Sequence, residues 1–192
     1  LAERMAPARD LVRKVIAENR VVYGITTVFV ALSNTRIPTE RASELQYDLI
    51  RSHASGGGPL LEPAIVRAML LCRARTLAQG YSGGRVEIVE RLIDMLNANI
   101  LPAVPSQGSV GASGDLAPFA HLALPLIGEG LVLTDHGTEP ATDALQRVGW
   151  DPLHLEPKEG LCLLNGTEGM LAHGCIAVHR ARQLIDAADG AC

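Results

Sequence analysis

The chain has 192 residues and a formal net charge of −4, and 47% of its residues are hydrophobic. This length is enough for one domain, or for one domain and part of another. The sequence has no basic stripe of the kind that binds nucleic acid, and no apolar run reaches the ~18 residues of a membrane span. We therefore expect a globular protein with neither a nucleic-acid nor a membrane partner.

Cysteine usage points to a reducing compartment and gives no sign of a metal site. The four cysteines lie far apart and form no C-x-x-C pair: Cys72, Cys162, Cys175 and Cys192. Zinc binding is therefore not expected, and we assign no metal ligands. The first fifteen residues lack the apolar core of a signal peptide. Reduced, mostly buried thiols then indicate a cytoplasmic protein.

Helices dominate the first half of the predicted elements. Apolar residues at helical spacing and prolines at helix starts mark the helices, and β-branched residues or glycine runs mark the segments between them. In chain order, the pattern predicts a helix over 8–19, a β-like or irregular segment over 21–32, a helix over 38–52, a flexible break over 56–60, a helix over 63–80, a turn over 82–84, and a third long helix to about Asn99.

The second half begins with a loop rich in glycine and proline and continues with shorter elements. Residues 115–130 are predicted to be helical, with Pro118 and Pro125 shortening or bending the helix. A small hairpin is expected over 130–140, followed by a short helix capped by Thr142 or Asp143. A last amphipathic helix runs to about Asp189. Its apolar residues would remain exposed unless they pack on something beyond this chain, so we expect a piece of a longer, mostly helical protein or of an assembly.

The segment QGSVGASGDLAPFAH, residues 107–121, carries the chemistry. In Ala112-Ser113-Gly114, the Gly114 nitrogen can attack the Ala112 carbonyl carbon and close a five-membered ring. Loss of the Ser113 hydroxyl as water leaves an exocyclic methylidene, and the product is a 4-methylidene-imidazol-5-one made without an external cofactor. A tight, strained loop favours such a closure, and the positive end of the following helix favours negative charge on the ring. By itself, the tripeptide is also an ordinary loop sequence.

The surrounding segments resemble those of the aromatic amino-acid ammonia-lyase family, in the same order along the chain. They are VVYGITT, LIRSHASGGGPL, MLLCRARTLAQGYSG, LNANILPAVPSQGSVGASGD and PKEGLCLLNGTEGM. The resemblance extends from about Tyr23 to Met170. Five ordered matches are much more specific than one tripeptide, and they favour the ring-forming interpretation of the loop.

The resemblance implies a mainly α fold of the aspartase-like superfamily. Residues 1–165 would be the N-terminal domain that carries the Ala-Ser-Gly loop and a small hairpin. Residues 166–192 would begin a long helix of the central helical bundle. Family members are several hundred residues long and form homotetramers whose active sites combine segments from three subunits. The resemblance therefore implies a homotetramer for the full-length protein, with further site residues beyond Cys192.

The resemblance also assigns the reactive residues. Ala112, Ser113 and Gly114 would form the ring, and Asp115 follows them as it does in the family. Addition of the substrate amine to the methylidene carbon turns nitrogen into a better leaving group. The family's base falls on Tyr23, which would remove the β-proton as a phenolate. The pKa of a tyrosine is about 10, so this role needs a positive local field that lowers it.

Substrate-binding roles fall on three further positions. His53 matches the histidine of the family's Ser-His loop, and Asn165 matches the asparagine of its Asn-Gly-Thr segment. Glu168 stands where members that act on histidine carry an acid or glutamine, so His53 and Glu168 would bind or orient an imidazole. We interpret His121 as structural, and His173 and His179 lie on different faces of their helix, which makes them poor metal ligands.

The implied reaction is the non-oxidative deamination of L-histidine to trans-urocanate and ammonia. One alternative is a tyrosine or phenylalanine ammonia-lyase or 2,3-aminomutase. Another is a catalytically inactive remnant, because Val28 and Val30 replace the glycines of the family's Gly-Phe-Gly and a β-branched residue is strained at positive φ. Arg75 also stands where relatives often carry a small or amide residue.

Overall fold

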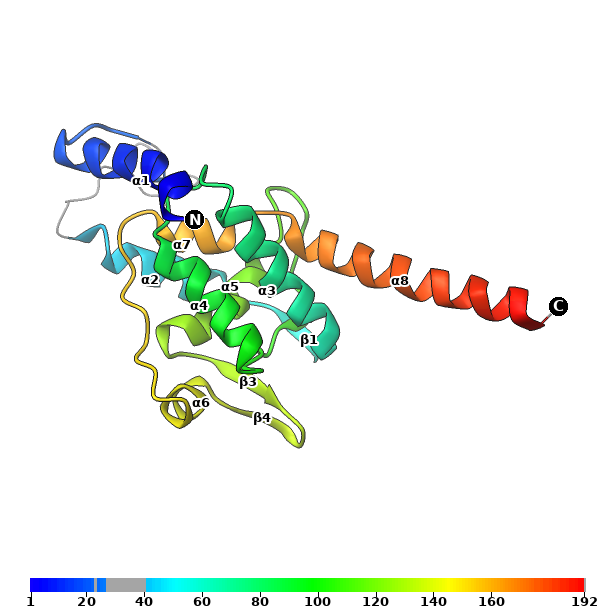
Figure 1. Cartoon of the computed structure of the whole chain (residues 1–192). Coiled ribbons are helices and arrows are strands. Elements are labelled where there is room, and N and C mark those ends of the chain that lie inside the picture. Colours follow the sequence, from blue (N-terminus) through cyan, green and yellow to red (C-terminus); the bar gives the residue numbers. More distant parts are fainter. Residues whose placement is uncertain (23, 27–40, 192) are drawn as a thin grey trace.

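The computed structural model describes residues 1–22, 24–26 and 41–191 of the chain (Figure 1). A body of packed helices with two small two-stranded sheets occupies one end, and a single long helix, α8 (Glu168–Ala191), projects from it. The predicted mainly α fold is therefore confirmed. The proposed division at residue 165 stays a prediction, although the projecting helix begins three residues later.

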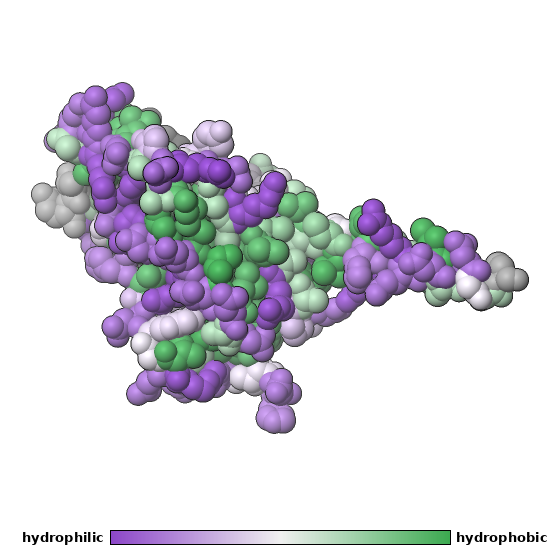
Figure 2. Space-filling view, in the orientation of Figure 1, coloured by the Kyte–Doolittle hydropathy of each residue, from purple (hydrophilic) through white to green (hydrophobic). Residues whose placement is uncertain are grey.

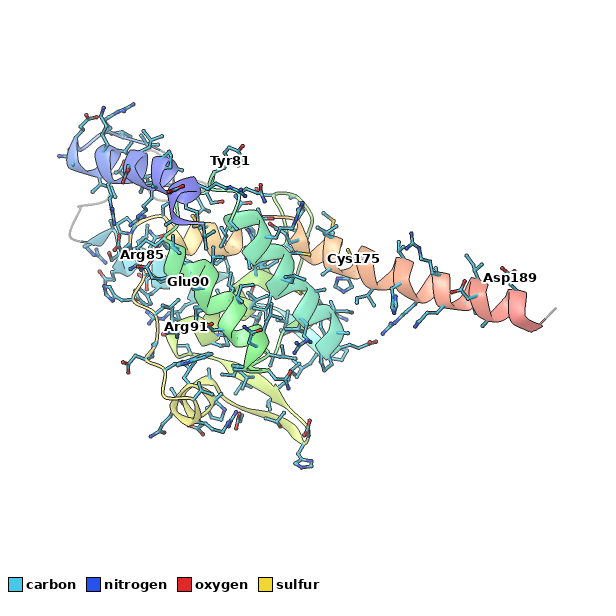
Figure 3. The ribbon with its side chains drawn as sticks, in the orientation of Figure 1. Tyr81, Arg85, Glu90, Arg91, Cys175 and Asp189 are labelled. Carbon is cyan, nitrogen blue, oxygen red and sulfur yellow. The ribbon has the colours of Figure 1, made fainter. Side chains whose placement is uncertain are left out.

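The core forms around α3 (Pro63–Leu77) and α4 (Val86–Asn97), which pack against each other. Each helix has apolar residues at three- and four-residue spacing, so one face of each is buried. On α4, the buried residues are Ile88, Val89, Leu92 and Met95. Figure 3 shows Glu90 and Arg91 along the same helix, and the Arg91 guanidinium lies over the Trp150 ring at 5.1 Å from its centroid. The strong amphipathic pattern of α4 explains its prediction from the sequence, whereas α3 was predicted from Pro63 at its start and Gly80 after its end.

Helices α2 (Glu44–His53), α5 (Leu116–Ala123) and α7 (Glu159–Leu164) pack on one another within the body. Helix α2 begins at Glu44, after a turn at residues 41–43, so the predicted helix over 38–52 is shorter within the described residues; its predicted start at Pro38 lies outside them. Helix α7 was not predicted as a separate helix. Its six residues are too few for a clear period, and its burial depends on α2 and α5 rather than on its own pattern.

The expected flexible break at 56–60 is wrong. Strand β1 (Gly57–Leu60) pairs antiparallel with β2 (Pro105–Gln107), and Gly57 lies opposite Gln107. A glycine-rich strand has no β propensity of its own, so the ladder depends on a partner far along the sequence. The hairpin of β3 (Leu131–Thr134) and β4 (Gly137–Pro140) is confirmed.

Proline has the predicted effect on the helix that follows the loop. Helix α5 ends at Ala123, and the 3₁₀ turn η3 (Leu124–Ile127) contains Pro125. Pro118 lies in the first turn of α5, where its missing N–H costs no helical hydrogen bond. The short helix α6 (Ala141–Arg147) begins earlier than expected, with Pro140 at the N-cap instead of Thr142 or Asp143.

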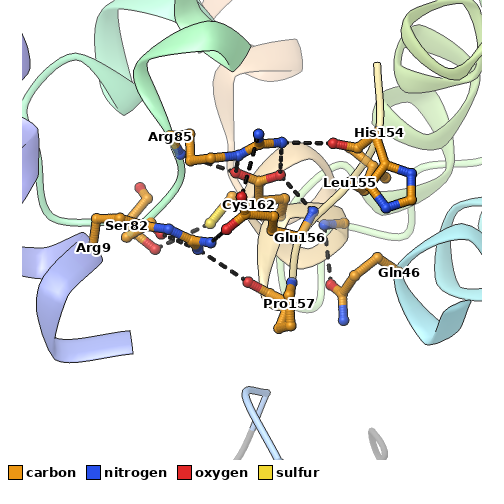
Figure 4. Close-up of polar contacts among 12 residues, drawn as sticks. Arg9, Gln46, Ser82, Arg85, His154, Leu155, Glu156, Pro157 and Cys162 are labelled. Atoms are coloured by element: carbon orange, nitrogen blue, oxygen red, sulfur yellow. Dashed lines mark hydrogen bonds and ion pairs between the residues drawn. The ribbon is translucent and has the colours of Figure 1, made fainter. Parts of the chain in front are cut away.

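A polar cluster fastens α1 (Ala2–Ala17) to the body (Figure 4). Arg9 is buried, pairs with Glu156 and donates to the carbonyl oxygens of Gly83 and Pro157, each at 3.2 Å. Beside it, the Arg85 side chain holds the buried Glu159 carboxylate at 2.8 and 2.9 Å. The hydrogen bonds connect α1, the loop before α4 and the start of α7.

Helix α8 buries only its first turns. Within it, Glu168, Gly169 and Ala172 are buried, whereas Leu171, Val178 and Ile185 are 49%, 55% and 60% exposed. Figure 2 shows apolar patches along the projecting helix, and Figure 3 places Cys175 near the body and Asp189 near the tip. The expected exposure of the last helix is therefore confirmed.

Among the residues that the structure describes, one segment, Glu159–Ala191, is long and apolar enough to cross a membrane when length and composition alone are considered. This finding corrects the expectation that no segment would reach that length. A core helix of a water-exposed assembly passes the same test, so the absence of a membrane partner stays a prediction.

Candidate active site

The Ala-Ser-Gly loop is a bend of residues 111–114 that ends directly at α5. Ala112 and Ser113 are exposed, whereas Gly114 is buried with φ of 111°, a conformation that residues with side chains rarely adopt. A Cβ atom on Gly114 would come within 2.9 Å of the Gly166 nitrogen. The middle residue is therefore accessible, and the third is held against another segment where only glycine fits.

Asp115 anchors the loop to α8. The side chain is only 3% exposed, its Oδ1 accepts a hydrogen bond from Ser109 Oγ at 2.7 Å, and its Oδ2 accepts one from the Met170 backbone N–H at 2.9 Å. Its own backbone N–H donates to the Gly166 carbonyl oxygen at 2.7 Å. A carboxylate at the first turn of a helix is also stabilised by the helix dipole. Asp115 thus fixes both ends of the bend relative to the start of α8.

His53 meets the loop in a pocket of about 220 Å³. Its lining is Ser52, His53, Ser55, Gly108, Val110, Ala112, Ser113, Gly114, Leu116 and Ala117. His53 Nδ1 lies 2.9 Å from the Leu49 carbonyl oxygen, which can only accept, so Nδ1 carries the proton. In the neutral ring, Nε2 is then the acceptor. The structure brings His53 and Ser113 together from distant parts of the sequence.

His121 supports the wall of this pocket. Its Nε2 accepts a hydrogen bond from the Gly56 backbone N–H at 3.0 Å, which ties the segment after α2 to α5. Burial lowers the pKa of the imidazole below its ordinary value. A neutral ring with an acceptor at Nε2 satisfies both observations, and it agrees with the structural role predicted for His121.

Asn165 and Glu168 lie where α7 turns into α8. Asn165 is exposed and follows the end of α7, and its carbonyl oxygen accepts a hydrogen bond from Arg73 Nη1 at 3.1 Å. Glu168 is 6% exposed, and its Oε2 lies 3.0 Å from Arg73 Nη2 in an ion pair. Substrate-binding roles for Asn165 and Glu168 stay predictions. The Gly166 carbonyl between them bonds to Asp115, so this turn and the Ala-Ser-Gly loop are neighbours.

Tyr23 lies outside the described residues, as do Val28 and Val30, so their predictions are not tested. The neighbouring residue Ile25 is buried and packs on Val12 and Val15 of α1.

Arg73 is the prominent site neighbour that the sequence analysis missed. The buried face of α3 consists of Val66, Met69, Leu70, Arg73, Ala74 and Leu77. An arginine at an apolar position of an amphipathic helix is the signal that was available, because buried arginines need a partner. Nothing in the sequence pattern identified that partner as Glu168.

A second pocket, of about 360 Å³, adjoins Asp115 and the first turns of α8. Met69, Met170 and His173 contribute to its lining. Across residues 1–22, 24–26 and 41–191, no group of three histidine, cysteine, aspartate or glutamate side chains is placed to hold a metal ion.

The site thus combines a mainly helical body, an Ala-Ser-Gly loop that ends in a positive-φ glycine, and a histidine that lines the same pocket. The whole chain, residues 1–192, matches the sequence profile of aromatic amino acid lyases. The chain belongs to the aromatic amino acid lyase family.

Individual relatives agree with this assignment. The histidine ammonia-lyase of Chloroflexus aurantiacus is 50% identical over 187 residues, which is 97% of this chain and 36% of the relative. The crystal structure of histidine ammonia-lyase from Trypanosoma cruzi superimposes with a TM-score of 0.86 at 41% identity, covering 95% of this chain and 35% of that one. The crystal structure of tyrosine aminomutase from Streptomyces globisporus superimposes with a TM-score of 0.88 at 41% identity. The match covers 94% of this chain and 34% of the aminomutase chain. The chain thus spans about a third of the length of the relatives it matches.

Proposed function

We propose that this chain forms the N-terminal part of a histidine ammonia-lyase, which converts L-histidine to trans-urocanate and ammonia. The observation that carries the proposal is the pocket shared by His53 and the Ala-Ser-Gly loop, in a chain half identical to enzymes of that name. Cytoplasmic localisation and assembly into a homotetramer belong to the same proposal.

The residues present fit a 4-methylidene-imidazol-5-one group. Ala112 and Gly114 supply the two small positions of the ring, and Ser113 is exposed to the pocket where a methylidene carbon would be needed. The position of Gly114 excludes any side chain, in agreement with a loop shaped for backbone closure. When formed, the group supplies an electrophile for the amine of the substrate.

The protein's own groups would bind the amino acid and move its protons. His53 lines the pocket, and with Nδ1 donating to Leu49 its Nε2 is free to accept, which suits the N–H of a substrate imidazole. Tyr23 is proposed as the base for the β-proton. The exposed Asn165 is proposed to orient the substrate amine. Glu168 is proposed to act on the imidazole, and its position beside Arg73 means that a bound substrate would share that carboxylate with the guanidinium.

The proposal is tested in an enzyme of the relatives' full length that carries these 192 residues as its N-terminal part. Ring closure removes two waters, so the intact mass should be about 36 Da below the value calculated from the sequence. Addition of L-histidine should produce urocanate, measured by its ultraviolet absorbance. Ser113→Ala should retain the unmodified mass and lose activity by at least about 10³-fold, since the electrophile cannot form.

Thr134→Ala, on the distant β3–β4 hairpin, serves as the control and should keep both the lower mass and the activity. Deamination by a protein with an intact Ser113 would contradict the proposal. An unmodified mass together with no activity would instead favour an inactive remnant.

A tyrosine-specific lyase or aminomutase is the second candidate, favoured by the structural match to tyrosine aminomutase at the same sequence identity. Product analysis with L-tyrosine separates the two. A cinnamate-type acid or a β-amino acid, formed faster than urocanate from L-histidine, would favour the second candidate.

A further inference from the structure

We propose that Arg73 is a positioning residue for closure of the ring, acting through the turn between α7 and α8. The inference rests on the proposed function, since it concerns how the Ala-Ser-Gly loop matures. Arg73 lies on α3, away from the pocket that His53 and Ser113 share, and none of the residues that line that pocket belongs to α3. Its effect therefore has to be transmitted by the segments that it touches.

The Arg73 guanidinium is fixed on several sides. The side chain is 1% exposed, its Cζ lies 4.2 Å from the centroid of the Phe119 ring, and Nη2 lies 3.0 Å from Glu168 Oε2. Nη1 donates to the carbonyl oxygens of Asn165 at 3.1 Å and Cys162 at 3.4 Å. Burial lowers the pKa of Arg73, and the Glu168 charge opposes that shift. Such a buried, charge-assisted contact holds the turn after α7 in one place.

Gly166 transmits this position to the loop. A Cβ atom on Gly166 would come within 2.8 Å of Arg73 Nη1 and closer still to Glu168 Oε2, so the ion pair of Arg73 and Glu168 packs against the Gly166 backbone. On its other side, the Gly166 backbone presses on Gly114 and accepts the Asp115 N–H. The Arg73–Glu168 ion pair, the Gly166 backbone and Gly114 are thus in contact one after another. A shift of the guanidinium must shift the loop, because close-packed interiors transmit displacement.

Closure of the ring depends on the position of Gly114, whose backbone nitrogen is the attacking atom. A bond forms between the Gly114 nitrogen and the Ala112 carbonyl carbon, and the carbonyl oxygen leaves as water with the amide protons of Gly114 and Ser113. Ser113 then loses its Cα proton and its hydroxyl as a second water, which leaves the Cα=Cβ double bond. No oxidant or reductant is needed. Holding the Gly114 nitrogen near the Ala112 carbon raises the rate of the first step.

The test follows the 36-Da mass loss, about two waters, over time after cell-free synthesis of the full-length enzyme. Arg73→Met alone would leave the Glu168 charge buried without a partner, so the main variant is Arg73→Met/Glu168→Met. The two methionines fill the space and remove both charges, which preserves packing but removes the hydrogen bond to Asn165. We expect ring closure to slow about tenfold, the scale of one charge-assisted hydrogen bond. Arg73→Lys keeps the charge and one donor, and it should recover part of the rate.

Arg75→Met is the matched control, because Arg75 is exposed on the same helix two residues further on. It should mature at the unsubstituted rate. Thermal unfolding midpoints show whether each variant is folded at the assay temperature. Unslowed closure in folded Arg73→Met/Glu168→Met, or closure in folded Arg73→Lys that is no faster than in this double variant, would overturn the role of Arg73 while the proposed function stands. Failure of the unsubstituted enzyme to lose 36 Da, about two waters, would instead overturn the proposed function.

Discussion

At the scale of single residues, the site combines groups that are adjacent in the chain with groups that only the fold brings together. Ala112, Ser113 and Gly114 are adjacent, so their ring-forming pattern is visible without a fold. Their meeting with His53 followed only from the family resemblance. No role was predicted for Arg73. Its partners are Glu168 and the Asn165 carbonyl oxygen, and they lie on a turn whose path the sequence pattern does not specify.

His121 should make the stability of the pocket wall depend on pH. Its folded-state pKa lies below the ordinary 6.5 because of burial. Below about pH 6.5, His121 therefore binds a proton more readily in the unfolded chain than in the folded chain. The free energy of unfolding should fall as the pH drops below about 6.5. Nε2 also accepts from Gly56, and a protonated ring cannot accept.

Urea unfolding at about pH 7.5 and about pH 5 measures this effect. His121→Gln places a non-titrating amide oxygen near the same N–H, so its loss of stability between the two pH values should be smaller. An equal loss in both proteins would show that His121 does not carry the dependence.

At the scale of elements, the long amphipathic helices were predictable and the short elements were not. Helices α3 and α4 show their buried faces in the sequence because each spans three or more turns. Strand β1 and helix α7 are stabilised by partners distant in the chain, β2 for the strand and α2 and α5 for the helix. Tertiary contacts therefore decided the elements that local propensity left open.

Arg9 should be the main attachment of α1. Arg9→Met removes the ion pair with Glu156 and the donors to Gly83 and Pro157. We expect the free energy of unfolding to fall by about 2 kcal/mol, less than for a fully buried pair because the Glu156 side chain is 35% exposed. Arg13→Met, with a side chain 60% exposed one turn later, should change it by less than about 0.5 kcal/mol. Equal effects in urea unfolding would contradict this assignment.

At the scale of the whole molecule, α8 is the helix whose apolar surface is largely exposed. Leu171, Val178 and Ile185 recur every seven residues and remain exposed on a helix that leaves the body. A seven-residue apolar repeat is typical of helices that pack side by side. Since the chain covers about a third of its relatives' length, this surface fits the proposed bundle of a tetramer.

Val178→Glu/Ile185→Glu should disrupt that assembly in the full-length protein. Burying two carboxylates in an apolar seam between helices costs several kcal/mol, roughly enough to weaken association of the subunits. The tetramer should then dissociate, and the measured molar mass should fall to that of a smaller species. Light scattering after gel filtration measures the mass. Gln183→Glu, on the opposite side of the helix, should leave it unchanged. Tetramers that persist in the double variant would show that this seam is not part of the interface.

The hydrogen bond from the Met170 backbone to Asp115 has a consequence for the timing of synthesis. Among the contacts of residues 109–115 described above, Met170 is the partner furthest along the chain. Once the ribosome has released the polypeptide a little past that point, the bend already has every one of these partners. In the proposed full-length tetramer, the shape of the bend therefore need not wait for the synthesis of residues after α8 or for the other subunits.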